Sequence, residues 1–392
     1  MKKTGITDGA QDIYLTGNPQ ITFFKVVYRR HTNFALESIQ QTFNGTVDFN
    51  RKVTCTVSRN GDLIHRTYLQ VTLPALTVGS GKTVKWVEKV GHALIDYVNI
   101  EIGGQEIDRH YGDWLNIWNE LTQTAEHMDG HDVLIGNTTG LKGNADTSTP
   151  ETVLYIPLQF WFCRNPGLAL PLIALQYHEV KFNISFRPAN ELIITSDGND
   201  ISPTPVMGDS ALWIDYIYLD TDERRQFAQV QHEYLIEQLQ YTGAESYSNS
   251  TIKSKLSLNH PCKELVWVLQ LDSNAVAKKW FDYTSSDADI LKSGKLQLNG
   301  HDRFDERDAK YFGVVQPYQH HTNIPQTGVY VYSFALNPEQ HQPSGTVNMS
   351  RIDNATLLLN LNSSAAVQLR TYATNYNVLR IMAGMGGLAY SN

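Results

Sequence analysis

The chain has 392 residues, 41% of them hydrophobic and 18% charged, with a formal net charge of −8. This length suits two or three ordinary domains. The negative charge argues against direct, specific nucleic-acid binding, because neutralising phosphates requires a surplus of Lys and Arg. No stretch has the length and apolarity of a membrane-spanning helix, and the start, MKKTGITDGAQ, lacks the apolar segment of a secretory signal.

The first distinctive segment is the basic, aromatic run FFKVVYRRH at 23–31. Its side chains could contact nucleic acid or anionic lipid headgroups, although a charged strand with an apolar inner face is the commoner structure for such a run. The candidate contact residues are Phe23, Phe24, Lys25, Tyr28, Arg29 and Arg30.

Strand signals dominate the chain after this run: Val, Ile, Thr, Tyr and Phe alternate with polar residues and are interrupted by Gly, Pro and Asn. VNIEIGGQEI at 98–107 predicts a hairpin, with Gly103-Gly104 supplying the positive φ angles of a tight turn. KFNISF at 181–186 and LLLNLN at 357–362 alternate as half-buried antiparallel strands do.

Two insertions and one connector interrupt the strands. Residues 110–150 contain Trp114 and Trp118 at helical spacing, followed by a polar loop. A second long loop spans 195–210. The polar stretch DTDERRQFAQVQ at 220–231 predicts a short helical connector with Asp220 as its N-cap.

The chain repeats itself across this connector. NFALESIQQT at 33–42 matches EYLIEQLQYT at 233–242, with Phe34 aligned on Tyr234. Three further pairs follow in the same order: 69–71 with 269–271, 101–105 with 297–301, and 215–219 with 375–379. Two copies of this length indicate a duplicated domain rather than a solenoid. We expect the halves to superpose, with the turn at Gly104 on that at Gly300.

Cysteine and histidine give no catalytic or metal-binding motif. Cys55, Cys163 and Cys262 form no CxxC pair, which predicts buried or half-buried free thiols in a protein made in the cytoplasm. His127 and His131 in HMDGH could share a helix face as metal ligands do, but a solvated loop is the preferred interpretation, and the same holds for His320-His321.

Two further segments contain residue types that occur in catalytic or phosphate-binding sites. The carboxylates within 302–308 could do glycosidase chemistry, but interspersed opposite charges are typical of a solvated turn. The glycine-rich AGMGG at 383–387 lacks the residues of a phosphate loop and predicts a tight C-terminal fold-back. We therefore expect no enzyme activity, no catalytic residue, no cofactor and no metal.

Asn-x-Ser/Thr triplets are possible glycosylation sites, although this modification presumes a secretory route for which the chain gives no signal. The candidates are Asn44, Asn137, Asn183, Asn249, Asn348, Asn354 and Asn362.

Several long segments resemble the major capsid proteins of nucleocytoplasmic large DNA viruses. They are GAQDIYLTGNPQITFFKVVYRRHTNFALESI at 9–39, PGLALPLIALQYHEVKF at 166–182, HEYLIEQLQYTG at 232–243, QPSGTVNMSRIDNATL at 342–357 and NYNVLRIMAGMGGLAYSN at 375–392. The resemblance runs from end to end and is weakest at 74–92, 110–150 and 244–295.

The resemblance implies an all-β fold of two tandem eight-stranded antiparallel jelly rolls, with long loops in the first copy. The expected division is an N-terminal arm at 1–31, a first jelly roll at 32–221, a connector at 222–232 and a second jelly roll at 233–392. It also implies a homotrimeric, pseudo-hexameric capsomer in an icosahedral virion capsid, made in the host cytoplasm.

Further partners follow from the same resemblance: neighbouring capsomers, minor capsid and penton proteins, the inner membrane side of the particle, and attached glycans. We expect the arm at the inner base, the two insertions on the outward surface, and the trimer held by neighbouring lobes and first-copy loops. The alternatives are a tandem β-sandwich carbohydrate-binding protein, with Trp114 and Trp118 stacking on sugars, or a carbohydrate-active enzyme.

Overall fold

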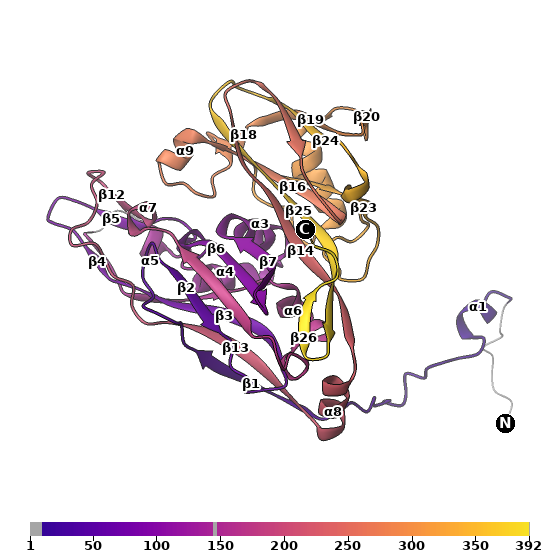
Figure 1. Cartoon of the computed structure of the whole chain (residues 1–392). Coiled ribbons are helices and arrows are strands. Elements are labelled where there is room, and N and C mark those ends of the chain that lie inside the picture. The colour runs from indigo at the N-terminus through magenta and orange to yellow at the C-terminus, as the bar shows by residue number, and fades with distance from the viewer. Residues whose placement is uncertain (1–9, 144–146, 392) are drawn as a thin grey trace.

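The computed structural model describes residues 10–143 and 147–391, which form two β-rich lobes (Figure 1). The first lobe holds the strands up to residue 219 and the second those from residue 232 onward. Each lobe contains two packed antiparallel sheets, a large one and a small one. Within these residues, no helix is long and apolar enough to cross a membrane.

In the first lobe the large sheet has the order β1-β13-β3, with β9 and β10 sharing the far edge of β3, and the small sheet has the order β2-β11-β6-β7. The strands are β1 (Phe34–Gln41), β2 (Lys52–Thr56), β3 (Leu63–Leu73), β6 (Ile95–Ile102), β7 (Gln105–Tyr111), β9 (Thr152–Pro157), β10 (Leu170–Pro171), β11 (Val180–Phe186) and β13 (Ser210–Leu219).

The second lobe repeats this order. Its large sheet runs β14-β25-β16 and then β22 and β23, with β26 added to β25, and its small sheet runs β15-β24-β19 and then β20 and β21. The strands are β14 (His232–Tyr247), β15 (Thr251–Leu256), β16 (Pro261–Leu271), β19 (Leu291–Leu298), β20 (His301–Asp302), β21 (Arg307–Asp308), β22 (Val329–Ser333), β23 (Val347–Asn348), β24 (Ala355–Leu361), β25 (Val367–Met382) and β26 (Met385–Leu388).

The jelly-roll arrangement follows the expectation, but the strand count differs. The described sheets of the first lobe have five and four strands, and those of the second have six and five, rather than eight per lobe. The difference arises because an edge position is divided between two short strands in three of the sheets, and because β26 extends the second lobe. Three two-stranded pairs lie outside these sheets: β4 (Leu76–Thr77) with β8 (Ser148–Thr149), β5 (Val84–Trp86) with β12 (Ile193–Thr195), and β17 (Thr284–Ser285) with β18 (Ala288–Asp289).

The two predicted hairpin turns occupy the same place in both lobes. Gly103 and Gly104, with φ of 59° and 88°, join β6 to β7, and Asn299 and Gly300, with φ of 52° and 80°, join β19 to β20. Both central residues have positive φ, as a type I′ turn requires. The C-terminal glycine-rich segment makes a third hairpin between β25 and β26, which confirms the predicted fold-back.

The insertion at 110–150 is mostly helical, so the expectation of a long loop there is only partly correct. It contains α3 (Gly112–Thr122), α4 (Ala125–Leu134) and α5 (Thr139–Lys142). The connector is α8 (Thr221–Gln229), whose N-cap Asp220 accepts a hydrogen bond from Thr221, as predicted. The remaining helices are α1 (Ile13–Thr16), α2 (Val90–Leu94), α6 (Trp161–Arg164), α7 (Ala189–Leu192), α9 (Asp272–Val276), α10 (Gln316–His320), η1 (Pro166–Leu168), η2 (Leu172–Ala174), the π-helix η3 (Tyr311–Val315) and η4 (Met349–Arg351).

The sequence repeat is out of phase with the structure by one residue. Gln41 accepts a hydrogen bond from the backbone N–H of Ser58 (3.1 Å), and Gln240 accepts one from Asn259 (2.8 Å). Gln41 and Gln240 therefore play the same role, whereas the repeat pairs Gln40 with Gln240. The expected superposition of Phe34 on Tyr234 is wrong by one residue, because a shift of one moves every side chain to the opposite face of the sheet.

The hydrophobic core is continuous between the lobes. One cluster of buried side chains fills the first lobe and includes Val266, Val268 and Tyr372 from the second lobe's large sheet. A separate cluster, which includes Trp267 and Leu357, lies between the two sheets of the second lobe. The large sheet of the second lobe is thus buried on both faces. All three cysteines are free and buried, as predicted.

Candidate functional site

The carboxylates considered for glycosidase chemistry lie exposed on the segment from β20 to β21, and both of these short strands pair with β19. Asp302 accepts hydrogen bonds from Gln297 (2.6 Å) and Lys295 (3.0 Å), and these bonds lower its pKa. Hydrogen bonds from Ser293 and Asn360 lower the pKa of Glu306 in the same way. A general acid requires a raised carboxyl pKa, so this pair is poorly suited to the role.

The HMDGH histidines do not converge, and the predicted solvated loop is a helix, α4. His127 is exposed and bonded to Thr124 (2.7 Å), whereas His131 is buried against His92, with ring centroids 5.3 Å apart. Burial lowers the pKa of His131 to about 4. Among the described residues, no three His, Cys, Asp or Glu side chains gather as a metal site would require.

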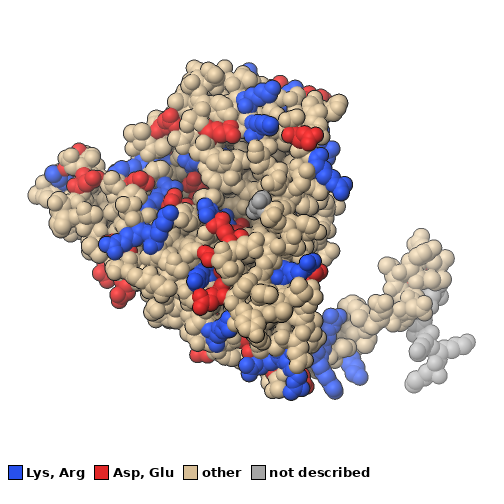
Figure 2. Space-filling view, viewed as in Figure 1, with Lys and Arg blue, Asp and Glu red and all other residues tan. Residues whose placement is uncertain are grey.

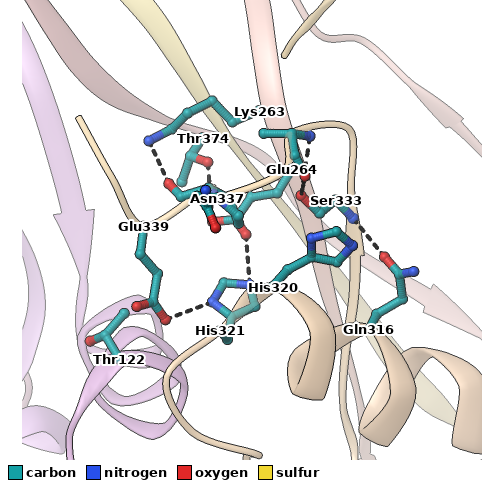
Figure 3. Close-up of polar contacts among 12 residues, drawn as sticks. Thr122, Lys263, Glu264, Gln316, His320, His321, Ser333, Asn337, Glu339 and Thr374 are labelled. Carbon is teal, nitrogen blue, oxygen red and sulfur yellow. Dashed lines mark hydrogen bonds and ion pairs between the residues drawn. The ribbon is translucent and has the colours of Figure 1, made fainter. Parts of the chain in front are cut away.

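The prediction of a solvated environment is wrong for His321, whose side chain is fully buried at the end of α10. Its Nε2 lies 2.9 Å from Glu264, and its Nδ1 lies 3.0 Å from Glu339 (Figure 3). Burial disfavours the charged ring, but the two carboxylates outweigh this effect and raise the pKa of His321 to about 9. The sequence around His320-His321 does not predict this buried ion pair, because Glu264 is 57 residues away in the chain.

Lys263 makes a second buried attachment beside His321. It forms an ion pair with Glu237 and donates a hydrogen bond to the carbonyl of Pro338 (2.6 Å). Arg164 of the first lobe reaches the same Glu237 carboxylate at 3.1 Å. This cluster therefore joins the segments on either side of β22 to the second lobe's large sheet and joins that sheet to the first lobe.

One contact between the lobes is made by α3, which packs on the outer face of the second lobe's large sheet. Asp113 pairs with Arg370 at 2.7 Å, and both side chains are buried. Trp114 packs against Tyr372, with ring centroids 5.5 Å apart. Figure 1 shows α3 at the junction of the two lobes.

The strand that precedes α3 contributes to the same contact. Asp108 in the middle of β7 accepts a hydrogen bond from the backbone N–H of Leu239 (3.0 Å), and Gln238 donates to the carbonyl of Ile107. The helical spacing of Trp114 and Trp118 predicted a helix with one apolar face. The sequence does not predict which surface of the protein the apolar face of this helix covers.

The N-terminal arm is the one long segment that leaves the body of the described chain (Figure 1). Phe23, Phe24 and Tyr28 are 89%, 97% and 85% exposed. The alternative of a charged strand with a buried inner face is wrong, because residues 23–31 form no strand and all are exposed. Figure 2 shows Lys and Arg side chains gathered where the arm joins the body. An apolar segment this exposed is a candidate contact for another molecule.

The asparagines of the seven triplets differ in accessibility. Asn137 and Asn183 are half-buried, and Asn183 is bonded within its sheet to Thr54 (2.7 Å) and Glu101 (3.1 Å). The other five are exposed; Asn249 lies in a bend and Asn354 in the irregular segment before β24. Asn249 and Asn354 are therefore the more accessible candidates, whereas the side chain of Asn183 has a structural role in its sheet.

Both halves of the chain match known protein families. Residues 22–220 match a family described as "Major capsid protein N-terminus", and residues 223–387 match "Large eukaryotic DNA virus major capsid protein". The chain is 56% identical to the major capsid protein of Pyramimonas orientalis virus, with 98% of this chain and 97% of the relative covered. It is 43% identical to that of Paramecium bursaria Chlorella virus 1, with 98% of each covered.

Solved structures agree with the sequence matches. A chain in a quasi-atomic model of the PBCV-1 virus capsid has a TM-score of 0.83 and 38% identity, with 95% of this chain and all of that chain covered. The Faustovirus major capsid protein has a TM-score of 0.81 at 14% identity, with 97% and 95% covered, which supports the fold alone.

Proposed function

Because the chain belongs to the family of large eukaryotic DNA virus major capsid proteins, we propose that it acts as a homotrimer whose six lobes form a pseudo-hexameric capsomer. The chain is a major capsid protein, a structural molecule of the virion. The observation that carries the proposed trimer is the duplicated lobe. Two similar lobes in each of three chains place six similar units around one axis, so a trimer can occupy a site with six neighbours.

The proposed division of labour follows the fold. Residues 1–31 are the arm, 32–221 and 233–392 are the two jelly rolls, and 222–232 connect them. The jelly rolls contact each other within the capsomer and contact neighbouring capsomers around it. The protein is made in the host cytoplasm and assembles there into an icosahedral shell.

The arm is proposed to lie at the inner base of the capsomer, where minor capsid proteins, penton proteins or the inner membrane side would meet it. Its exposed Phe23, Phe24 and Tyr28 offer apolar contact area, and Lys25, Arg29 and Arg30 offer positive charge for an acidic partner or anionic lipid headgroups. An arm with so little contact to its own body gains buried area only by binding another molecule.

Attached glycans are a further proposal, with Asn249 and Asn354 as the best-placed acceptors because both are exposed and lie outside helices and strands. Intact-mass measurement of protein purified from virions tests this, and Asn183→Gln serves as the matched variant at a half-buried position. Loss of a glycan in Asn249→Gln or Asn354→Gln supports the assignment. An unmodified mass for the wild-type protein refutes it.

The carbohydrate-binding alternative has no support. Trp114 and Trp118, the aromatics that would stack on sugar rings, are 2% and 5% exposed, and Arg164 covers the ring of Trp118 at 4.5 Å. Their apolar surface is already used to join the two lobes. The relatives that match the chain are named as structural capsid proteins, and we propose that this chain likewise has no catalytic role.

Multi-angle light scattering of the purified protein tests the trimer. We expect a mass three times that of the 44.3 kDa chain. A stable trimer must bury more than the roughly 1,600 Å² of a standard interface, so it should persist on dilution to nanomolar concentration. A monomer under assembly conditions would refute the proposal.

A further inference from the structure

The covered sheet face of the second lobe has an uncovered counterpart in the first lobe. In the second lobe the outer face of the large sheet, with Val266, Val268 and Tyr372, is fully buried. In the first lobe the same face has Val153 and Tyr155 on β9, 44% and 41% exposed. This face lies on the side of the first lobe away from the second lobe (Figure 1).

The uncovered face is continuous across the strands. Tyr155 lies opposite Gln70 in the ladder, and Tyr68 lies opposite Trp213, so these side chains share one face. Tyr68, Gln70 and Trp213 are half-buried, and Trp213 donates a hydrogen bond to Gln70. Such an aromatic, sparsely charged sheet surface is typical of the core of an interface. We call Tyr68, Gln70, Val153, Tyr155 and Trp213 the open face.

The covering element also has a counterpart. In the first lobe, α3 follows the edge strand β7, and its Trp114 and Trp118, four residues apart, are buried, with Trp114 packed on Tyr372 of the second lobe. In the second lobe, η3 and α10 follow the edge strand β21 in the same way. Their Val314 and Tyr318, also four residues apart, are 38% and 77% exposed.

The exposed apolar side chains of this helical segment form one patch. Val315 next to Val314 is 37% exposed, and Leu336 is 71% exposed. His320 bonds to the carbonyl of Leu336 at 3.0 Å, which places Leu336 beside the end of α10. Residues at i and i+4 lie on one face of a helix, so Val314 and Tyr318 point the same way. We call Val314, Val315, Tyr318 and Leu336 the helix patch.

We propose that the helix patch of one copy packs on the open face of a second copy, as α3 packs on the second lobe within each chain. This inference rests on the proposed trimer and names the surfaces that close it. The ring would then alternate contacts within chains with contacts between chains. Each copy presents one unfilled surface of each kind, and a heterologous pair of this kind closes a ring when its rotation allows, as the proposed trimer requires.

A groove beside the open face gives the helix room. It has a volume of about 700 Å³ and is lined by Tyr68 and Pro157 from the sheet and by His127 and Leu134 from α4. A second copy fits this surface better than an unrelated protein. The chain already contains the helix that the open face lacks and the face that the helix patch lacks.

Three single variants test the contact by light scattering and thermal melting. Tyr155→Glu places a charge on the open face, and Tyr318→Glu places one on the helix patch. Val206→Glu, at a 63% exposed apolar position in the loop at 195–210, is the control. We expect the first two to sediment and scatter as monomers of 44.3 kDa, and the control to stay trimeric.

An equimolar mixture of Tyr155→Glu and Tyr318→Glu adds a sharper measurement. Tyr155→Glu keeps an intact helix patch and Tyr318→Glu keeps an intact open face, so the mixture should form a two-chain species that neither variant forms alone. Contacts that do not join these two surfaces cannot give this complementation.

The outcomes separate this inference from the proposed function. A wild-type trimer together with trimeric Tyr155→Glu and Tyr318→Glu variants overturns the proposed contact and leaves the trimer standing. A monomeric wild type overturns the trimer itself. If Tyr155→Glu fails to fold, judged by circular dichroism, Tyr318→Glu still decides, because Tyr318 is 77% exposed and makes little contact with its own chain.

Discussion

Arg370 and Asp113 form the buried ion pair that ties α3 to the second lobe, at 2.7 Å. Removing one partner of such a pair leaves an uncompensated buried charge, so Arg370→Met should lower the free energy of unfolding by about 3–5 kcal/mol. Arg380, on the same strand, pairs with Glu233 at 2.9 Å but is about half exposed. Arg380→Met should cost less than about 1 kcal/mol.

Denaturant unfolding of the two variants under identical conditions checks this prediction. The double variant Arg370→Met/Asp113→Leu should recover part of the loss, because it removes the Asp113 carboxylate that Arg370→Met leaves without its closest partner; Arg187, 3.9 Å from Asp113, then loses that contact. Equal destabilisation by Arg370→Met and Arg380→Met would contradict the importance of burial at this contact.

His321 gives the protein a pH-dependent contribution to stability. Its pKa is about 9 in the folded protein, against 6.5 as the ordinary value. A group with a raised folded pKa stabilises fully below its unfolded pKa, and this contribution is lost as pH rises through the folded pKa. The protein should therefore lose stability between about pH 6.5 and pH 9.

The variant His321→Asn isolates this effect. It should lower the free energy of unfolding by about 2–3 kcal/mol at pH 6, and the difference from wild type should shrink above pH 9. His301→Asn, at an exposed position on β20, is the matched control and should leave the pH profile unchanged. A His321→Asn deficit that is constant from pH 6 to pH 10 would rule out titration of this ring as its cause.

At the scale of elements, the hairpin turns were the features best predicted from the sequence. Gly-Gly and Asn-Gly pairs between alternating strands are strong local signals, because few residues adopt positive φ. Gly104→Ala and Gly300→Ala should each cost about 1 kcal/mol, since φ is +88° and +80° at these positions. Gly79→Ala, at an open position whose φ is not in this region, should change stability by less than about 0.5 kcal/mol in the same thermal melts.

The alignment of β1 with β14 shows that residue identity alone does not fix which positions are structurally equivalent. β1 contains the adjacent pair Gln40-Gln41, and β14 contains Gln238-Leu239-Gln240. The alignment with most identical residues has an offset of 200 and pairs Gln40 with Gln240. The hydrogen bonds instead pair Gln41 with Gln240, which is an offset of 199. Inward and outward faces alternate with each residue, so only the hydrogen bonds of these Gln side chains decide between the two alignments.

Helix α3 illustrates a different limit. The spacing of Trp114 and Trp118 correctly predicted a helix, while the polar residues behind it suggested an exposed insertion. Nine of its eleven residues are in fact buried, and Trp114 packs on Tyr372 of the second lobe. Local periodicity reports that one face is covered, but the partner Tyr372 lies far along the chain and leaves no local signal.

At the scale of the molecule, duplication and family resemblance predicted the two jelly rolls, while the packing between them could not be predicted. The contact of Asp113 with Arg370 and that of His321 with Glu264 join residues far apart in the chain. Each residue type in these pairs is common at exposed positions, so burial of the charge is visible only once the sheets are assembled. The sequence therefore predicts the fold of each lobe but does not predict which surfaces pack together.

The proposed orientation of the molecule in the shell, with the arm at the inner base and the loop at 195–210 on the outward surface, can be tested at its exposed segments. The loop at 195–210 and the arm are both accessible in the isolated chain, with Val206 63% and Phe24 97% exposed. A broad-specificity protease such as subtilisin should cut both in the free protein, because it needs flexible, exposed backbone. In intact particles the arm, placed at the inner base, should be protected, while the outward loop at 195–210 should still be cut.

The insertion at 110–150 was also expected on the outward surface, but part of it is helical and buried. Residues 112–122 are buried in α3, so cleavage in that region should not occur in either sample, whatever the orientation. Mass spectrometry of the fragments over a time course gives the rates at each segment, and the loop at 195–210 is the internal control for protease access. Assembly should slow cleavage at 23–31 at least tenfold and leave the loop unaffected. Cleavage of the arm at equal rates in free protein and particles, or protection of the loop alone, would place the arm on the outer surface instead, because only a segment covered by the shell loses access to the protease.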